Sequence, residues 1–563
     1  MKLCPKCRTN YSDDTLNFCL EDGTPLVSRA EVHEPATALL SGVQSLSELP
    51  TRPQVRTTSK KAGIAPPQNR LKASNRRLLA LAGVAVLATG GFLWFRNVET
   101  GVRQIESIAV MPFVNESGNA DVEYLSDGMT ETLISSLSQL PNLNVKARSS
   151  VFRYKGKETN AQTIGKELNV QAILNGRVVQ RGEDLILYVE LVDVQTENSL
   201  WKQTYNKTMT NLVSLQNDIA RDVADKLKVK LSGADEQKLT KNYTENAEAY
   251  QLYLKGRYHY SRLTSPEIQI GISYLRQSIE VDPTYALAYA GLSDAYRSLA
   301  VAGDMLPTDF LPKSKAAANK AIELDDTLAE AHIVLGVAIF WSEWNWTAVE
   351  NQYKRALELN PRSADAHLYY AHLLSVTGRH SDALAEVKLA RELEPLNLRI
   401  MALEGQFLTH AGRSDEALAR FQEIYALDSS FWLAHTFAAS AYIEKGMFAE
   451  AIAEARRARQ LFDGSSQPMA FEGYALAKSG KIAEARAVLE ELLKLSTTGY
   501  VTPYHIALVY NGLNERDKTL TWLERAYEQR SPRMVFLKVE PKWNNLRSDL
   551  RFQELIKKVG FAE

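Results

Sequence analysis

The side chains best suited to chemistry lie at the very start of the chain. Cys4 and Cys7 form a Cys-x-x-Cys knuckle, and Cys19 belongs to a second, half-formed one. The sequence has 3 cysteines in all, so the rest of the chain holds no thiol and no disulfide framework. Thiolates at this spacing are typical ligands of a structural zinc ion. The three thiols therefore belong to one small site.

The opening segment, residues 1–29, resembles the short zinc-ribbon modules at the start of many bacterial membrane proteins. Those modules usually supply four thiolates, whereas this sequence has Asp22 at the fourth position. Because a carboxylate can ligate zinc, the resemblance implies a structural zinc site made of Cys4, Cys7, Cys19 and Asp22. Such a short ribbon needs its metal in order to fold. The alternative is a segment without a stable metal site.

An uncharged stretch further along is long enough to cross a membrane. Residues 78–95 read LLALAGVAVLATGGFLWF, and with the flanking arginines the expected transmembrane helix covers 76–97. Eighteen helical residues extend about 27 Å, close to the ~30 Å hydrocarbon core. Residues 30–75 before it are rich in Ser, Thr, Pro and basic side chains. We expect them to form a disordered basic tether that contacts anionic membrane lipid.

The basic residues also predict an orientation. Eight Lys or Arg and no acidic residue lie between Arg52 and Arg77, whereas the other flank of the helix mixes both charges. By the positive-inside rule, the amino terminus is cytoplasmic and residues after about 97 are extracytoplasmic. We therefore expect a single-pass protein of the cytoplasmic (inner) membrane.

Residues 103–232 carry the pattern of a mixed α/β domain, because short β-branched runs alternate with helical spacing. The expected elements are a buried strand over 105–114, a helix capped by Asp127, extended structure from Val145, a hairpin over 172–180 and 185–194, and a helix over 215–231.

Motifs in this segment resemble the TolB amino-terminal-like domain, also described as FlgO-like. They include Tyr124-Leu125-Ser126-Asp127-Gly128 and Leu174-Asn175-Gly176-Arg177-Val178. The resemblance covers the segment from end to end. It implies a small mixed α/β module in the cell envelope that stands behind a membrane helix, precedes tetratricopeptide repeats and is not known to be catalytic. We interpret Asp127, Arg148 and Ser149 as a helix cap and a solvated loop.

The carboxy-terminal half repeats with a fixed period. Small residues align at Gly256, Gly291, Gly336, Ala371, Gly405, Ala439, Gly473 and Ala507, and the intervals after Gly336 are 35, 34, 34, 34 and 34 residues. This is the tetratricopeptide period, so residues 246–540 are predicted to form an all-α solenoid. An insertion around 302–312 is predicted to form a loop that projects towards a partner. Residues 541–563 resemble the closing segment of proteins that combine these two domains and are expected to cap the stack.

Stacked helix pairs leave a long concave groove, which we predict binds protein or peptide ligands. Two sets of side chains invite other interpretations. His332, His367 and His435 lie four positions before the small-residue column, so we interpret them as one recurrent packing position and not as a metal cluster. Trp341, Trp344 and Trp346 fall where the first helix of a repeat turns into the second, and packing is again the expected role.

The predicted fold class is multidomain: a small zinc ribbon, one transmembrane helix, a mixed α/β TolB-like domain and an all-α tetratricopeptide solenoid. The net charge of −1 and the pI near 6.8 argue against a nucleic-acid partner. The sequence has no phosphate-binding loop, metalloprotease helix or nucleophile elbow, so we predict no enzyme activity.

The predicted function is a membrane-anchored protein-binding scaffold that presents the TolB-like and tetratricopeptide module outside the cytoplasmic membrane. The alternative is a signalling relay with the zinc ribbon as its cytoplasmic output module. The sequence leaves the partner and the oligomeric state open.

Overall fold

The computed structural model describes three two-residue strands near the amino terminus and residues 105–561, except 141, 228–231, 234–238, 240, 263, 303–304 and 463–464. The chain divides into two compact units, 1–100 and 101–563. In the first, β1 (Lys2–Leu3) pairs antiparallel with both β2 (Asn10–Tyr11) and β3 (Val27–Ser28). The predicted zinc ligands Cys4, Cys7, Cys19 and Asp22 and the predicted membrane helix 76–97 lie outside the described residues. No helix within the described ranges has the length and apolar character needed to span a bilayer.

The second unit begins with a six-stranded mixed sheet in the order β6-β4-β7-β8-β9, with β5 paired to β7. Strand β4 lies parallel to β6 and β7, whereas β7, β8 and β9 are antiparallel. The strands are β4 (Ser107–Val110), β5 (Val114–Asn115), β6 (Asn144–Val145), β7 (Ala172–Arg181), β8 (Asp184–Asp193) and β9 (Ser199–Thr208). The helices are α2 (Glu123–Ser138), α3 (Arg148–Val151), α4 (Ala161–Leu168) and α5 (Leu212–Lys226), with 3-10 turns η1 (Ala120–Val122), η2 (Phe152–Tyr154) and η3 (Met209–Asn211).

The predicted mixed α/β domain and its hairpin are confirmed. Strands β7 and β8 pair antiparallel along their whole length, and Gly182 supplies the left-handed φ of +61° that their tight turn requires. The predicted strand over 105–114 is interrupted, because Met111 to Phe113 separate β4 from β5. Strand β9 was not predicted; most of its side chains are exposed, so it lacks the alternation that marks a half-buried strand.

The prediction that Asp127 caps a helix is wrong. Helix α2 begins at Glu123, one turn earlier, directly after η1. The side chain of Asn119 caps η1 by accepting a hydrogen bond from the backbone N–H of Asp121. The capping residue therefore lies eight positions before Asp127, at the start of η1 and not of α2. Asp127 is instead buried inside α2, where its Oδ1 accepts a hydrogen bond from Lys155 Nζ at 2.5 Å.

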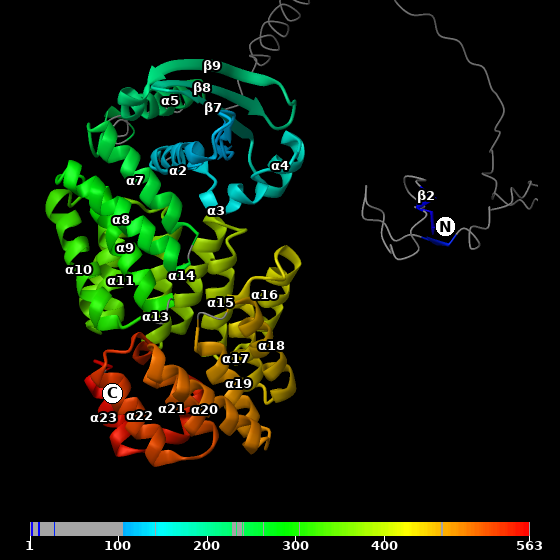
Figure 1. Cartoon of the computed structure of the whole chain (residues 1–563), viewed down its shortest axis with the longest axis vertical. Helices are drawn as coiled ribbons and strands as arrows, with labels where there is room; N and C mark the ends of the chain where they lie inside the picture. Colours follow the sequence, from blue (N-terminus) through cyan, green and yellow to red (C-terminus); the bar gives the residue numbers. More distant parts are fainter. Residues whose placement is uncertain are drawn as a thin grey trace, which may run out of the picture. The chain divides into compact units, whose positions relative to one another are not determined.

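The rest of the described chain is a stack of antiparallel helix pairs, and the predicted all-α solenoid is confirmed (Figure 1). The pairs are α7 (Ala247–Tyr260) with α8 (Ser265–Val281), α9 (Ala286–Ala302) with α10 (Pro307–Leu324), α11 (Ala329–Ser342) with α12 (Trp346–Leu359), α13 (Ala364–Val376) with α14 (His380–Leu393), α15 (Leu398–His410) with α16 (Ser414–Leu427), α17 (Trp432–Glu444) with α18 (Phe448–Leu461), α19 (Gln467–Lys478) with α20 (Ile482–Thr498), and α21 (Pro503–Gly512) with α22 (Arg516–Glu528).

The column of small residues marks the closest approach of the two helices in a pair. A Cβ placed on Gly405 would lie 2.4 Å from the ring of Phe421 on the paired helix. Gly336 has the same position in an earlier repeat, and a Cβ placed on it would lie 2.5 Å from the ring of Tyr353. In other repeats the small residue faces an aliphatic side chain, Leu275 for Gly256 and Val509 for Gly473. The period therefore recurs because a large side chain needs a small residue opposite it.

The predicted projecting loop over 302–312 is wrong. Ala302 ends α9, which has 17 residues, and Pro307 begins α10, which has 18. Proline is favoured in the first turn of a helix, so the inserted residues lengthen this helix pair and do not form a free loop.

A carboxy-terminal segment, residues 531–561, follows the last helix pair. It consists of η4 (Pro532–Phe536), η5 (Pro541–Leu546) and α23 (Leu550–Lys558). It starts before the predicted cap at 541 and shares one buried apolar cluster with residues of α9 to α14 and of α17 to α22.

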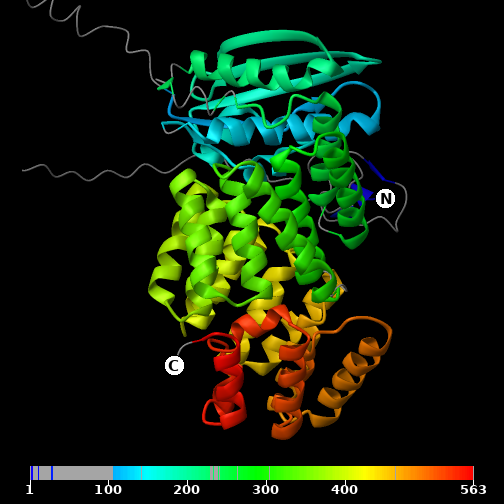
Figure 2. The ribbon, with the colours of Figure 1, turned by 90° about the vertical axis from the view of Figure 1, so that its left-hand side faces the viewer.

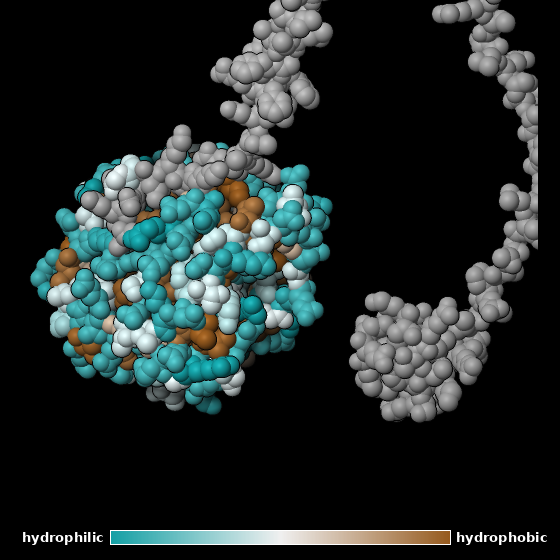
Figure 3. Space-filling model, turned by 90° about the horizontal axis from the view of Figure 1, so that it is seen from above, coloured by the Kyte–Doolittle hydropathy of each residue, from teal (hydrophilic) through white to brown (hydrophobic). Residues whose placement is uncertain are grey.

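The α/β domain and the repeats pack directly on each other within the second unit. Helix α2 contacts α5 and α7, and it lies between the sheet and the first repeat helices (Figures 1 and 2). The hydroxyl of Ser149 donates to Glu394 at 2.6 Å, which adds a contact between α3 and the end of α14. Seen from the sheet end, the surface drawn in colour mixes hydrophilic and hydrophobic side chains without one large apolar face (Figure 3).

Candidate functional site

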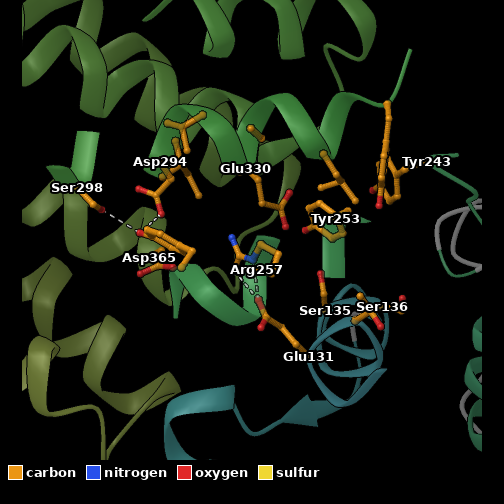
Figure 4. A pocket seen from close by; sticks show the side chains of 18 of the residues that line it. Glu131, Ser135, Ser136, Tyr243, Tyr253, Arg257, Asp294, Ser298, Glu330 and Asp365 are labelled. Atoms are coloured by element: carbon orange, nitrogen blue, oxygen red, sulfur yellow. Dashed lines mark hydrogen bonds and ion pairs between the residues drawn. The ribbon is translucent and has the colours of Figure 1, made fainter. Parts of the chain in front are cut away.

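A cavity of about 560 Å³ lies between α2 and the inner side of the helix stack (Figure 4). We call it the interdomain cavity. Its wall on the α/β side comes from α2 and α5, with Glu131 and Ser135 among its residues. Its repeat wall comes mainly from the first helix of successive pairs, namely α7, α9, α11, α13, α15 and α17. Residues 241–244, which precede α7, close one side. The cavity therefore depends on both domains.

The repeat wall is built from one recurring position. The residue six places before the small-residue column lines the interdomain cavity in six successive repeats: Tyr250, Tyr285, Glu330, Asp365, Arg399 and Leu433. We call this set the inner column. Side chains at equivalent places in a solenoid point the same way, so the column faces the inner side throughout.

Two basic side chains converge on Glu131 at the boundary between the domains. Arg257 of α7 donates from Nε to Oε1 at 3.1 Å, and Arg148 approaches Oε2 at 3.1 Å. Burial acts to raise the pKa of Glu131, but the two guanidinium groups outweigh it and hold the pKa below its usual value. This ion pair joins α2 to the first repeat.

Two further ion pairs line the repeat wall. On α9, Arg297 contacts Asp294 at 2.6 Å, and Asp294 also accepts from the hydroxyl of Tyr260. Between α13 and α15, Arg399 pairs with Asp365 and donates to the hydroxyl of Tyr369 at 2.9 Å. The cations of these pairs are thus already engaged by carboxylates of the protein.

Glu330 differs from the other acidic residues of the cavity. Among the described residues, it forms no ion pair and no hydrogen bond to another side chain. Burial raises the pKa of Glu330, and the nearby acids Asp365 and Asp325 add to the effect. Arg257 and the residue's own backbone N–H act in the opposite direction. A half-buried carboxylate without a partner is costly to the fold, which marks Glu330 for a functional role.

The inner side of the later repeats is occupied by the protein's own carboxy-terminal segment. The ring of Phe536 lies 6.3 Å from Trp341, 5.7 Å from His372 and 5.7 Å from His410, so it bridges the inner faces of α11, α13 and α15. Further along, Trp543 is fully buried and donates from Nε1 to the hydroxyl of Tyr504 at 2.7 Å. The groove predicted over 246–540 is therefore filled at the carboxy-terminal ends of α11, α13 and α15, whose amino-terminal parts line the interdomain cavity.

The interpretation of the recurrent histidines as a packing position is confirmed. In each case Nδ1 faces a side chain of the second helix and Nε2 faces a backbone carbonyl before the first helix. For His435 the partners are Glu454 at 2.6 Å and the carbonyl of Ser429 at 3.0 Å. His367 makes the same two contacts with Glu386 and Pro361, whereas His332 faces the neutral side chain of Gln352.

The contacts of His435 predict a pH-dependent stability. Burial acts to lower its pKa, but the hydrogen bonds to Glu454 and to the Ser429 carbonyl raise it above the usual value. A raised pKa in the folded state means that the extra stability is complete below pH 6.5 and is lost as the pH rises through the folded pKa. We expect His435→Gln to lower the free energy of unfolding by about 1.5 kcal/mol at pH 5.5 and by clearly less at pH 9.

Chemical denaturation of the two proteins at both pH values measures this difference. His332→Gln is the matched control, because His332 faces the neutral side chain of Gln352 where His435 faces the carboxylate of Glu454. A cost for His435→Gln that is the same at pH 5.5 and pH 9 would contradict the assignment.

The three tryptophans also pack as predicted. Trp341 and Trp344 are buried, and Trp346 stacks on Phe561 of the carboxy-terminal segment with ring centroids 4.8 Å apart. Their partners come from the end of the chain, which no periodicity could indicate.

The residues that the structure describes contain no group of His, Cys, Asp and Glu arranged to hold a metal ion.

Comparison with known families matches both halves of this unit. Residues 352–385 and 405–466 match tetratricopeptide repeats. The helix stack is a tetratricopeptide-repeat domain. Residues 104–222, the α/β domain, match the family described as the HilA/YgeH-like transcriptional regulator, second domain. The tetratricopeptide-repeat domain thus follows a HilA-like domain in this chain.

Two curated relatives share part of the chain. A Rhizobium meliloti (strain 1021) protein named "Putative adenylate cyclase 3" is 30% identical over 239 residues, which is 42% of this chain and 40% of that protein. The transcriptional regulator HilA of Salmonella typhimurium is 24% identical over 230 residues, 41% of each chain. Less than half of either relative is therefore matched. Among solved structures, Pseudomonas aeruginosa pilF is similar at 20% identity and a TM-score of 0.30, over 38% of this chain and 92% of that one.

Proposed function

We propose that this protein is a scaffold in which the interdomain cavity receives a segment of a partner protein. One observation carries the proposal: the chain's own carboxy-terminal segment fills the groove at the carboxy-terminal ends of α11, α13 and α15, whereas their amino-terminal parts line the interdomain cavity beside α2. An open cavity lined by aromatic rings and ion pairs is suited to hold a short peptide segment. The protein needs no catalysis for this role, and we propose that it is not an enzyme.

The remaining parts of the proposal rest on the sequence. The apolar stretch 76–97 anchors the chain in the cytoplasmic membrane, and the TolB-like and tetratricopeptide module is extracytoplasmic. The ribbon of residues 1–29 binds a structural zinc ion through Cys4, Cys7, Cys19 and Asp22. These four residues and the anchor lie outside the described part of the chain, so the proposal specifies no geometry for them.

A signalling relay is the second candidate. The named roles of the two relatives favour it, since one is a transcriptional regulator and the other carries the name of a cyclase. Both names belong to proteins of which this chain matches well under half. In a relay, occupancy of the interdomain cavity would change what residues 1–75 contact on the cytoplasmic side.

Blocking the cavity tests the proposed function. Ser135 is an exposed residue of α2 that lines the cavity and has a small side chain (Figure 4). We expect Ser135→Trp to fill the entrance and to reduce capture of partner proteins by the tagged full-length chain at least tenfold, because an indole occupies space that the partner segment needs.

Ser273→Trp is the matched control, since Ser273 is exposed on α8 and does not line the cavity. Quantitative mass spectrometry of the captured proteins compares the two variants with the unmodified chain. Equal capture by Ser135→Trp and Ser273→Trp would rule out the cavity as the binding site. Crosslinks from residues 1–75 that change with Ser135→Trp would favour the relay.

A further inference from the structure

The inner column contains a carboxylate for which the described part of the chain provides no ion-pair partner. Asp365 and Arg399 occupy the same position in neighbouring repeats and pair with each other. Glu330 holds this position in the preceding repeat, where its neighbours along the column are Tyr285, which is neutral, and Asp365, which has the same charge. The described cations near it are engaged by other carboxylates, since Arg257 pairs with Glu131 and Lys241 pairs with Asp325.

Two tyrosines lie on the same side of the cavity as this carboxylate. Burial raises the pKa of Tyr253 of α7 and of Tyr243 in the segment before it, and the nearby charge of Glu330 adds to the effect. Figure 4 shows Glu330 pointing from α11 into the cavity on the same side as Tyr253. A carboxylate beside tyrosine rings attracts a cation in two ways, by its charge and by the negative faces of the rings.

Resting on the proposed function, we infer that Glu330 receives the cationic side chain of a lysine or arginine in the partner segment, with Tyr253 and Tyr243 beside it. The unpaired carboxylate is the acceptor, and the ion pairs on either side exclude acidic residues from the same place. The rest of the cavity then holds the neighbouring residues of an extended peptide.

The other charged residues of the cavity favour a basic ligand side chain over an acidic one. Glu131 has two arginine partners and Asp294 has one, so neither of these carboxylates competes for the cation. Each of these arginines is in turn paired with a carboxylate, which reduces its repulsion of a bound cation. An acidic peptide would have to displace one of these pairs, at the cost of leaving a half-buried carboxylate unpaired.

Selection from a random heptapeptide phage library tests the inference. The full chain and three variants are immobilised: Glu330→Gln, Ser135→Trp to block the cavity, and Glu358→Gln as an exposed control on α12. We expect the unmodified chain and Glu358→Gln to select peptides with lysine or arginine at one fixed position. Glu330→Gln should select peptides without that preference. The Gln variant should fold normally, since it replaces a carboxylate that has no side-chain partner with a neutral group of the same shape.

Affinity measurements with a selected peptide complete the test. Replacing its basic residue by norleucine should weaken binding to the unmodified chain about 10- to 100-fold, the range of a charge-assisted contact. The same replacement should leave binding to Glu330→Gln nearly unchanged. Cavity-dependent peptides without a basic preference would overturn this inference and leave the proposed function standing. Selection of no peptide that Ser135→Trp blocks would overturn both.

Discussion

Lys542→Met is expected to lower the free energy of unfolding by about 3–5 kcal/mol, the cost of leaving buried charges without their partner. The Lys542 side chain has no exposed surface, and its Nζ lies 2.8 Å from Glu540 and 3.0 Å from Glu444 of α17. Burial acts to lower the pKa of Lys542, but these carboxylates raise it above the usual value. The lysine therefore stays charged and holds the carboxy-terminal segment in the groove.

A double variant separates the lost ion pair from lost packing. Lys542→Met with Glu540→Gln removes both ends of the closer pair and should regain a large part of the stability, because it leaves one fewer unpaired charge. Lys388→Met on α14 is the control: its pair with Glu392 is largely exposed and should contribute at most about 1 kcal/mol. Equal stability of Lys542→Met and Lys388→Met in urea would mean that the segment does not occupy the groove.

Arg257→Met is expected to lower the free energy of unfolding by about 2–4 kcal/mol. This is somewhat less than the loss of a fully buried ion pair, because Arg148 still contacts Glu131. The guanidinium of Arg257 links α7 to α2, together with the hydrogen bond from the Tyr250 hydroxyl to Thr132, so its removal should also loosen the α/β domain from the repeats. We expect calorimetry to show a lower unfolding temperature and a broader transition.

The partner of Arg257 provides the check on this effect. Adding Glu131→Gln to Arg257→Met should restore part of the lost stability, since the unpaired charge is then removed. If the double variant lost as much as the sum of the two single variants, the residues would contribute independently and the ion pair would have no role in joining the domains.

The repeat period predicted much of this fold because a helix pair can bury its apolar face only against its neighbours. The small-residue column located the contact between paired helices, and the inner column could have been found in the same way. Counting back six residues from each small residue gives tyrosine or charged side chains in five successive repeats before Leu433. Polar residues that recur at one position of an otherwise apolar helix indicate a lined cavity.

The contacts that close the cavity could not have been predicted from the sequence. Glu131 and Arg257 are 126 residues apart and lie on helices of different domains, so no local pattern relates them. The carboxy-terminal segment has no period, and Phe536 meets histidines more than a hundred residues earlier in the chain. The absence of a partner for Glu330 is likewise a property of the assembled wall, since its neighbours in the sequence do not specify which cations are already engaged.

Hydrogen exchange with a selected heptapeptide bound to the full chain tests most directly whether the interdomain cavity is the binding site. We expect slower exchange in α2, α7, α9 and α11, which line the cavity around Glu330, and unchanged exchange in residues 531–561. Protection confined to other helices, or faster exchange of the carboxy-terminal segment as the peptide takes its place, would contradict the account.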